Sequence, residues 1–304
     1  MGKDKIIVTV RIFLLFLPIY LGYLVYDHNN QGNNWIEEFG LTKKNEASDL
    51  NLSALLLGGS NVVYSLSASQ LDKLTELSWY NLGLSSEAFN DSNYWDYISN
   101  LLSEDRRKKI KLIVYSSAGL MRNGHIRKRS LEKSDAWGKR QFSWIPNVTL
   151  AVRLRDLVMQ KPKIRKYPLP VEKGDFDFDF EKKICEQNYS EVFEREMNWA
   201  DIERWVLLQS NEMLKLFPEA IIIFTVPSEY YGNKYDEEFD KSFFKKVKAY
   251  IQSKYKNRIK FFVQPAYSDK NITCDVGLHA NSEGRYWRTK NLSDFIDSLN
   301  INNG

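Results

Sequence analysis

Cysteine and histidine are scarce in this chain, whose 304 residues include two cysteines and three histidines. Two cysteines exclude a disulfide framework and a four-cysteine zinc site, and three histidines leave little room for a histidine-rich metal centre. The net charge of +4 is too small for this length to indicate nucleic acid as a partner. We therefore expect no metal, no cofactor and no nucleic acid. The 43% hydrophobic and 14% aromatic content is typical of a folded chain with a substantial core.

A long apolar run lies near the N-terminus, at residues 6–26. As a helix it is about 30 Å long, which matches the hydrocarbon core of a bilayer. Lys3 and Lys5 precede the run and a polar segment follows it, which predicts a cytoplasmic N-terminus and an extracytoplasmic remainder. The run ends in Tyr-Leu-Val-Tyr, without the small residues of a signal-peptide cleavage site. We therefore predict an uncleaved, single-pass anchor in the plasma membrane, with a buried core helix as the alternative.

Composition divides the chain into an anchor at residues 1–27, a linker at 28–50 and a folded domain at 51–304. More than 100 residues separate the third and fourth predicted strands, so residues 120–198 are interpreted as an insertion. Residues 122–173 carry 14 basic and 4 acidic side chains, whereas residues 175–203 carry 10 acidic and 3 basic ones. Either these are two solvated faces that pair with each other, or the basic part attracts an anionic glycan, a phosphate group or lipid headgroups.

Five short apolar runs without polar alternation predict strands that are covered on both faces. Helix-like stretches separate them, and this alternation predicts a five-stranded parallel sheet in a flavodoxin-like three-layer α/β/α fold. Sites in such folds lie at the carboxyl ends of the strands. The predicted strands are residues 52–57, 77–82, 110–115, 220–226 and 259–263, and the predicted helices are residues 67–76, 87–102, 199–216, 237–255 and 282–299.

A Gly-Gly-Ser-Asn sequence at residues 58–61 follows the first predicted strand. The glycines allow a tight turn, and Ser60 would then project its hydroxyl at the carboxyl edge of the sheet. A serine nucleophile needs a general base and hydrogen-bond donors for the oxyanion. The N–H groups of Asn61 and Gly83 are candidates for those donors. The alternative interpretation of residues 58–61 is an ordinary turn.

The best candidate base is His279, which lies just before the last predicted helix. Asp275 precedes it by four residues and can hold the imidazole in the required tautomer. The alternative interpretation is a loop histidine that contacts solvent.

These segments together resemble the SGNH, or GDSL-like, hydrolase superfamily over roughly residues 50–298. The resemblance implies a serine nucleophile in a Gly-x-Ser context after the first strand, here Ser60, and an oxyanion glycine after the second, here Gly83. It implies an Asp–His pair near the C-terminus, here Asp275 and His279. The ending His-Ala-Asn-x-x-Gly at residues 279–284 is similar to that of membrane-anchored members that modify envelope polymers.

The sequence departs from the family pattern at two places. The family spacing is Asp-x-x-His, whereas one more residue separates Asp275 from His279, so the working unit is a triad, a Ser–His dyad or a pair with another acid. The third family block contains an asparagine, which is replaced by Ser-Ser-Ala-Gly at residues 116–119. Ser117 or Asn123 is then the candidate third oxyanion donor.

The resemblance implies serine-dependent acyl transfer on the extracytoplasmic side, with O-acetylation of a surface or secreted polysaccharide as the expected reaction. The acceptor partner would be the polysaccharide, and a multi-span membrane protein would deliver the acyl group. The alternatives are a carbohydrate esterase or deacetylase and a non-catalytic glycan-binding or assembly protein on the same scaffold. Cys185 and Cys274 either form a disulfide outside the membrane or remain two buried thiols.

Overall fold

The computed structural model describes the core of the predicted domain. The described residues are 42–43, 45–47, 50–84, 94–117, 172–176, 199–226, 237–255, 257–263, 273–274 and 279–299. Their centre is a parallel five-stranded sheet with the strand order β2-β1-β3-β4-β5. The strands are β1 (Ala54–Gly58), β2 (Trp79–Asn81), β3 (Leu112–Ser116), β4 (Ile221–Thr225) and β5 (Ile259–Phe262). This order is the flavodoxin-like one, so the predicted sheet is confirmed.

The central strands are buried on both faces, as their continuous apolar sequences predict. Every residue of β1 and β3 is buried, and β3 pairs in register with both neighbours, Leu56 opposite Val114 and Val114 opposite Ile223. Alternate side chains of each strand enter separate apolar clusters, because successive residues of a strand point to opposite faces. In β1, Leu55 and Leu57 face one helical layer, while Leu56 faces the other.

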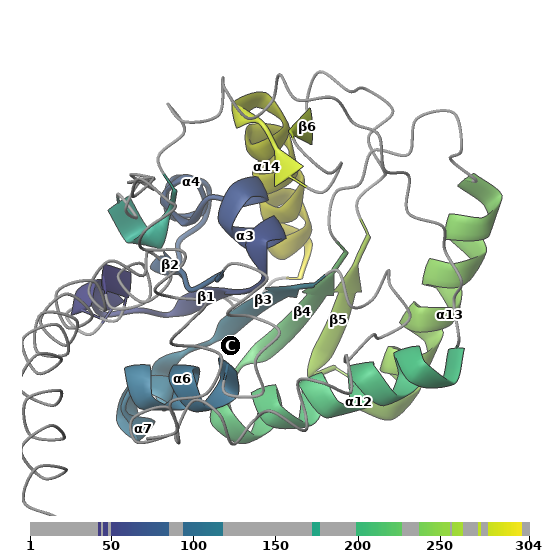
Figure 1. The fold of residues 1–304 in the computed structure, drawn as a ribbon. Helices are drawn as coiled ribbons and strands as arrows, with labels where there is room; N and C mark the ends of the chain where they lie inside the picture. The colour runs from purple at the N-terminus through teal and green to yellow at the C-terminus, as the bar shows by residue number, and fades with distance from the viewer. Residues whose placement is uncertain are drawn as a thin grey trace, which may run out of the picture.

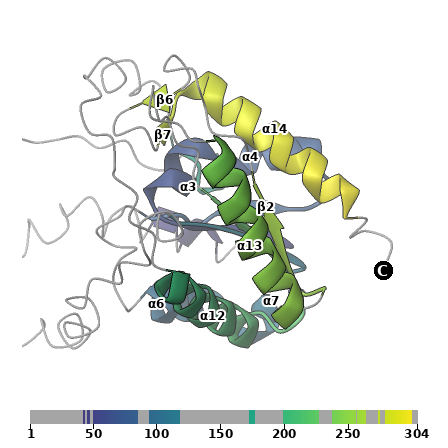
Figure 2. The ribbon, with the colours of Figure 1, turned by 90° about the vertical axis from the view of Figure 1, so that its right-hand side faces the viewer.

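Two helical layers cover the sheet and give the three-layer α/β/α architecture (Figure 1). One layer contains α6 (Tyr94–Leu101), α12 (Trp199–Leu216) and α13 (Glu237–Tyr255). The other contains α3 (Ser60–Ser65), α4 (Ala68–Leu74) and α14 (Ser282–Ser298). Figure 2 shows α14 and α12 on opposite sides of the sheet. The short helix α7 (Glu104–Lys109) leads into β3 and buries none of its residues.

Two described segments pack onto the edge strand β2 from outside the alternating elements. Residues 42–43 and 45–47, within the predicted linker, are helical, and Lys43 and Ala47 are completely buried. Lys43 in this part of the predicted linker contacts β2 through the Asn81 carbonyl. The second segment is the 3₁₀ turn η2 (Glu172–Gly174) with Asp175 and Phe176, which lies within the predicted insertion and packs against β2.

Several predictions fall on residues that the structure does not describe. These are the anchor at residues 6–26, most of the insertion, Asp275, Asn123 and Cys185. Within the described ranges, the helices are too short or too polar to cross a bilayer.

Candidate active site

Ser60 begins α3 directly after β1, at the carboxyl edge of the sheet. The turn before it requires glycine, because Gly58 has φ +143° and a Cβ there would lie 2.0 Å from the Ser116 carbonyl oxygen. The Gly58 N–H donates to the Tyr94 hydroxyl at 3.1 Å, which fixes the turn from the opposite layer. The close approach of β1 to β3 thus determines where the Ser60 hydroxyl emerges.

His279 reaches Ser60 from the other end of the chain. It lies in β7 (His279–Ala280), which pairs antiparallel with β6 (Thr273–Cys274). The Ala280 N–H donates to Ser65 Oγ at 3.0 Å and so ties β7 to the end of α3. His279 Nε2 lies 3.0 Å from Ser60 Oγ, which is hydrogen-bonding distance. The two residues are 219 positions apart in sequence.

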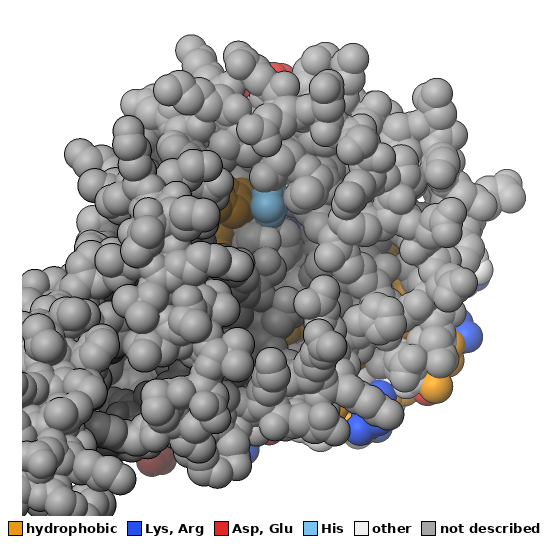
Figure 3. Space-filling view, in the orientation of Figure 1, with side chains coloured by type: hydrophobic (Ala, Val, Ile, Leu, Met, Phe, Trp, Pro, Cys, Tyr) orange, Lys and Arg blue, Asp and Glu red, His pale blue; other side chains and the backbone are white. Residues whose placement is uncertain are grey.

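The imidazole is held on one side and open on another. The Tyr64 ring lies against it with a centroid separation of 4.4 Å and an interplanar angle of 45°. Ser60 and His279 are both partly exposed. Pale blue histidine atoms are visible in a hollow of the surface in Figure 3, and His279 is the histidine among the described residues. Both side chains of the serine–histidine pair therefore retain some contact with solvent.

The residues that follow the histidine form a helix cap. Asn281 is the N-cap of α14, and its side-chain oxygen accepts a hydrogen bond from the Gly284 N–H at 3.0 Å. This bond satisfies one of the first-turn donors that a helix cannot pair internally. The His-Ala-Asn-x-x-Gly ending therefore has a structural meaning, because Asn281, two residues after His279, caps the helix that begins at Ser282.

Behind the serine, α14 supplies a buried guanidinium. Arg288 is 1% exposed and donates to the carbonyls of Asn61 and Val226, at 3.1 and 2.8 Å, and to Ser116 Oγ at 3.0 Å. Ser116 Oγ also accepts from the Asn61 side chain at 2.6 Å. Arg288 therefore joins the start of α3 to the carboxyl ends of β3 and β4. Arg288 follows the His-Ala-Asn-x-x-Gly segment by four residues, but its place in the sequence does not predict these contacts.

The predicted oxyanion donors differ in their surroundings. The Gly83 N–H donates to Asn81 Oδ1 at 3.0 Å, so its use for an oxyanion would require this bond to break. Ser117 follows β3 (Leu112–Ser116) directly, and its side chain is buried. Gly83 and Ser117 therefore stay predicted oxyanion donors. Asn61 lies in the first turn of α3, where backbone N–H groups have no partner within a helix.

Beneath the end of β2 lies a buried cationic side chain that sequence analysis missed. Lys43 donates to the carbonyl oxygens of Asn81 and Gly83, each at 2.8 Å. Burial lowers the pKa of its amine to about 7. A lysine in a segment of polar composition gives no local signal of burial, so its position next to the candidate site became visible only in the fold.

No family model matches the chain, and no curated protein matches it. Solved structures are similar at low identity. A structure from Streptococcus pneumonia described as a "platelet activating factor" has a TM-score of 0.44 and 12% identity, with 88% of this chain and 98% of that chain covered. An active-site mutant of a family two carbohydrate esterase from Clostridium thermocellum has a TM-score of 0.43 and 10% identity, with 81% of this chain and 63% of that chain covered.

An acetyl xylan esterase from Butyrivibrio proteoclasticus has a TM-score of 0.37 and 10% identity, and covers 82% of this chain. The chain spans 63% and 64% of the length of these two carbohydrate esterases. The site itself has a serine–histidine contact at the carboxyl edge of a flavodoxin-like sheet. This arrangement is consistent with the SGNH hydrolase superfamily, which the sequence motifs resemble.

Proposed function

We propose that the protein is a serine-dependent enzyme that moves acyl groups, most specifically acetyl groups, on or off carbohydrate hydroxyls. The observation that carries this proposal is the 3.0 Å separation of His279 Nε2 and Ser60 Oγ. It is the distance at which an imidazole can accept the serine proton as the oxygen attacks a carbonyl. A non-catalytic scaffold protein has no need of this contact, so the geometry favours an enzyme.

In the first half-reaction, Ser60 Oγ attacks the ester carbonyl while His279 Nε2 takes the hydroxyl proton. The tetrahedral oxyanion is stabilised by backbone N–H groups at the start of α3, with Asn61 as the assigned donor. The C–O bond to the leaving alcohol then breaks, and His279 returns the proton to that alcohol oxygen. The product is an acyl-enzyme on Ser60. Asp275 lies outside the described residues, and its proposed role is to orient the His279 imidazole.

In the second half-reaction, His279 removes a proton from an acceptor hydroxyl, whose oxygen attacks the acyl carbonyl. The bond between the acyl carbon and Ser60 Oγ then breaks, and His279 returns the proton to Ser60 Oγ. We propose that the acceptor is a sugar hydroxyl of a surface or secreted polysaccharide, which makes the protein an O-acetyltransferase. The predicted anchor supports this choice, because it would hold the domain beside an envelope polymer on the extracytoplasmic side. A multi-span membrane protein would deliver the acyl group there.

Hydrolysis is the second candidate, and the partial exposure of His279 favours it. Water that reaches the imidazole can replace the sugar in the second half-reaction, and the protein is then a carbohydrate esterase or deacetylase. The acyl-enzyme is common to both reactions. They differ in the fate of the acyl group, which mass spectrometry can follow on an acceptor oligosaccharide incubated with an acyl donor. In transfer the oligosaccharide gains the mass of the acyl group, and in hydrolysis its mass stays unchanged.

The proposal is tested by labelling the full chain in mild detergent with a fluorophosphonate, which reacts with activated serines. We expect labelling of Ser60 that disappears in Ser60→Ala and slows by about 100-fold or more in His279→Gln, because the general base is lost. Ser253→Ala is the matched control, because Ser253 is an exposed serine on α13. Labelling that persists in Ser60→Ala, or equals wild type in His279→Gln, would refute the assignment.

A further inference from the structure

Residues 172–176, which lie within the predicted insertion, pack tightly against β2. We call them the docking segment. Gly174 has φ +71°, and a Cβ there would lie 2.4 Å from the Asn81 carbonyl oxygen. Lys173 forms an ion pair with Asp72 of α4 at 2.9 Å. Asp175 and Phe176 follow and are each 3% exposed. The segment is therefore a built part of the domain core rather than a surface loop.

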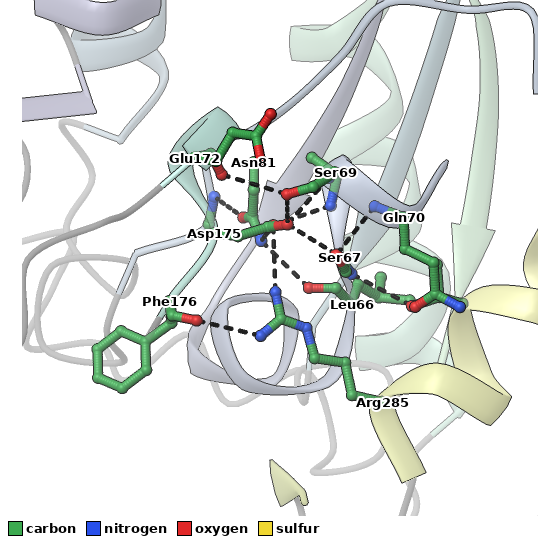
Figure 4. A network of polar contacts seen from close by, with 12 residues as sticks. Leu66, Ser67, Ser69, Gln70, Asn81, Glu172, Asp175, Phe176 and Arg285 are labelled. Atoms are coloured by element: carbon green, nitrogen blue, oxygen red, sulfur yellow. Dashed lines mark hydrogen bonds and ion pairs between the residues drawn. The ribbon is translucent and has the colours of Figure 1, made fainter. Parts of the chain in front are cut away.

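The Asp175 carboxylate fixes this segment to the layer that carries the candidate site (Figure 4). It accepts hydrogen bonds from the hydroxyls of Ser67 and Ser69, at 2.7 and 2.6 Å, and from the N–H groups of Ala68 and Ser69, at 2.8 and 2.9 Å. Arg285 of α14 forms an ion pair with it at 3.3 Å. A buried carboxylate with these partners holds α4, α14 and the docking segment together.

Asn81 extends the network toward the candidate site. Its side-chain nitrogen donates to Asp175 at 3.3 Å and lies 3.4 Å from the Leu66 carbonyl at the end of α3. Its side-chain oxygen accepts from the Gly83 N–H. The docking segment is thus linked through Asn81 both to the end of β2 and to the helix that begins with Ser60.

Phe176 makes a second connection, through aromatic rings. Its ring meets Tyr64 edge to face, with centroids 5.0 Å apart and an interplanar angle of 70°. Tyr64 in turn lies against the His279 imidazole at 4.4 Å. The Phe176 carbonyl accepts a hydrogen bond from Arg285 at 3.3 Å, so the backbone that carries the ring is tied to α14. The rings of Phe176, Tyr64 and His279 form a continuous row that ends at Ser60.

We propose that Phe176 is a positioning residue that holds the His279 imidazole against Ser60 through Tyr64, and that Asp175 holds Phe176 in place. The physical reason is that the Phe176 ring packs edge to face on Tyr64, so removing it takes away packing that restrains the Tyr64 ring beside the imidazole. A displacement of a catalytic group by about 1 Å can slow a reaction by about 100-fold. The consequence for activity rests on the proposed function, whereas the positioning of the imidazole does not.

The test measures the imidazole directly. The full chain in detergent micelles is labelled in its histidine rings, and NMR follows the His279 signals, which are assigned by their loss in His279→Gln. We expect Phe176→Ala to shift these signals and to slow fluorophosphonate labelling of Ser60 by about 10-fold or more. Phe176→Leu, which keeps most of the apolar bulk, is expected to recover most of the labelling rate and to move the signals back toward wild type.

Two further variants keep the result interpretable. Phe243→Ala is the matched control, because it removes another buried phenylalanine whose ring contacts Trp199 and Phe244 in the opposite layer. It is expected to leave the His279 signals in place. If Phe176→Ala does not fold, Tyr64→Leu carries the test, because it removes the ring that lies against His279 and is expected to shift the same signals.

The outcomes separate the two proposals. The positioning role is overturned if the His279 signals of Phe176→Ala coincide with those of wild type. If Phe176→Ala does not fold, the same comparison is made with Tyr64→Leu. Equal shifts in Phe243→Ala also overturn it, because they indicate a general loss of packing. If the expected shifts occur in a wild-type chain that shows no labelling at Ser60, the proposed function fails while the positioning of the imidazole stands.

Discussion

The folded chain should become more stable as the pH rises from about 7 to about 9, because Lys43 is completely buried. The pKa of its amine falls from 10.5 to about 7, mainly because burial disfavours the charged form. The carboxylates of Asp175 and Glu46 raise this pKa, whereas the Arg285 guanidinium lowers it. In the unfolded chain the ordinary pKa returns, so unfolding takes up a proton in the window between these two values. Stability therefore increases with pH through the window and reaches its low plateau below it.

The size of this effect follows from the two pKa values. A shift from 10.5 to about 7 corresponds to roughly 5 kcal/mol in the free energy of unfolding over the whole window. About 2 kcal/mol of this should appear between pH 7 and pH 9. The buried hydroxyls of Tyr80 and Tyr94 act in the opposite direction at higher pH, because burial raises their pKa values. The measurement therefore stays below about pH 10, where an unfolded tyrosine ionises.

The assay is urea unfolding of the full chain in mild detergent, followed by tryptophan fluorescence at several pH values. Lys43→Met should lose most of the rise in stability, because methionine fills the space without a titrating group. Lys111→Met, which removes an exposed lysine, should retain it. The reasoning about Lys43 would be refuted by an equal pH dependence in wild type and Lys43→Met, or by wild-type stability that falls between pH 7 and pH 9.

Two further substitutions test the frame around Ser60. Gly58→Ala should lower the free energy of unfolding by about 3 kcal/mol or more, because the new Cβ would meet the Ser116 carbonyl oxygen at 2.0 Å in a conformation that alanine avoids. Thermal unfolding measures this loss, and an unchanged midpoint would contradict the prediction. Arg288→Lys should destabilise the chain by about 2 kcal/mol and slow serine labelling, because an ammonium cannot replace the planar donor that reaches Asn61, Ser116 and Val226. Wild-type stability and labelling in this variant would show that the guanidinium is dispensable.

The amino-acid sequence predicted the sheet well because its signals are local. The runs around Leu55, Val114 and Ile223 are apolar without alternation, and such runs are typical of strands covered on both faces. The position of His279 just before the last helix was also predicted, and Asn281 caps the start of that helix. The short helix that begins with Ser60 was not predicted, and it has no side-chain cap. The roles of Ser60 and His279 follow from a resemblance of motifs, and the distance between them could not be derived from spacing along the chain.

The limits of sequence reasoning appear at groups whose availability depends on how the surrounding segments pack. Gly83 matches the expected oxyanion position, but its N–H is directed at Asn81, whose orientation depends on Asp175. Ser117 lies at the expected strand end, but its side chain is buried there, which the local sequence does not indicate. The Gly83–Asn81 bond spans only two residues, but the contact of Asn81 with Asp175 joins positions 94 apart and depends on how the docking segment packs.

By itself the sequence determined which segments become strands and helices, and it set a serine and a histidine at the ends of such elements, because hydrophobic periodicity and helix caps act over a few residues. Only the tertiary structure decided that the imidazole meets the hydroxyl, that Lys43 becomes a buried amine and that Asp175 and Phe176 pack behind the site. These features depend on burial and on contacts between segments more than 30 residues apart. Their free energies exist only once the layers have assembled around the sheet.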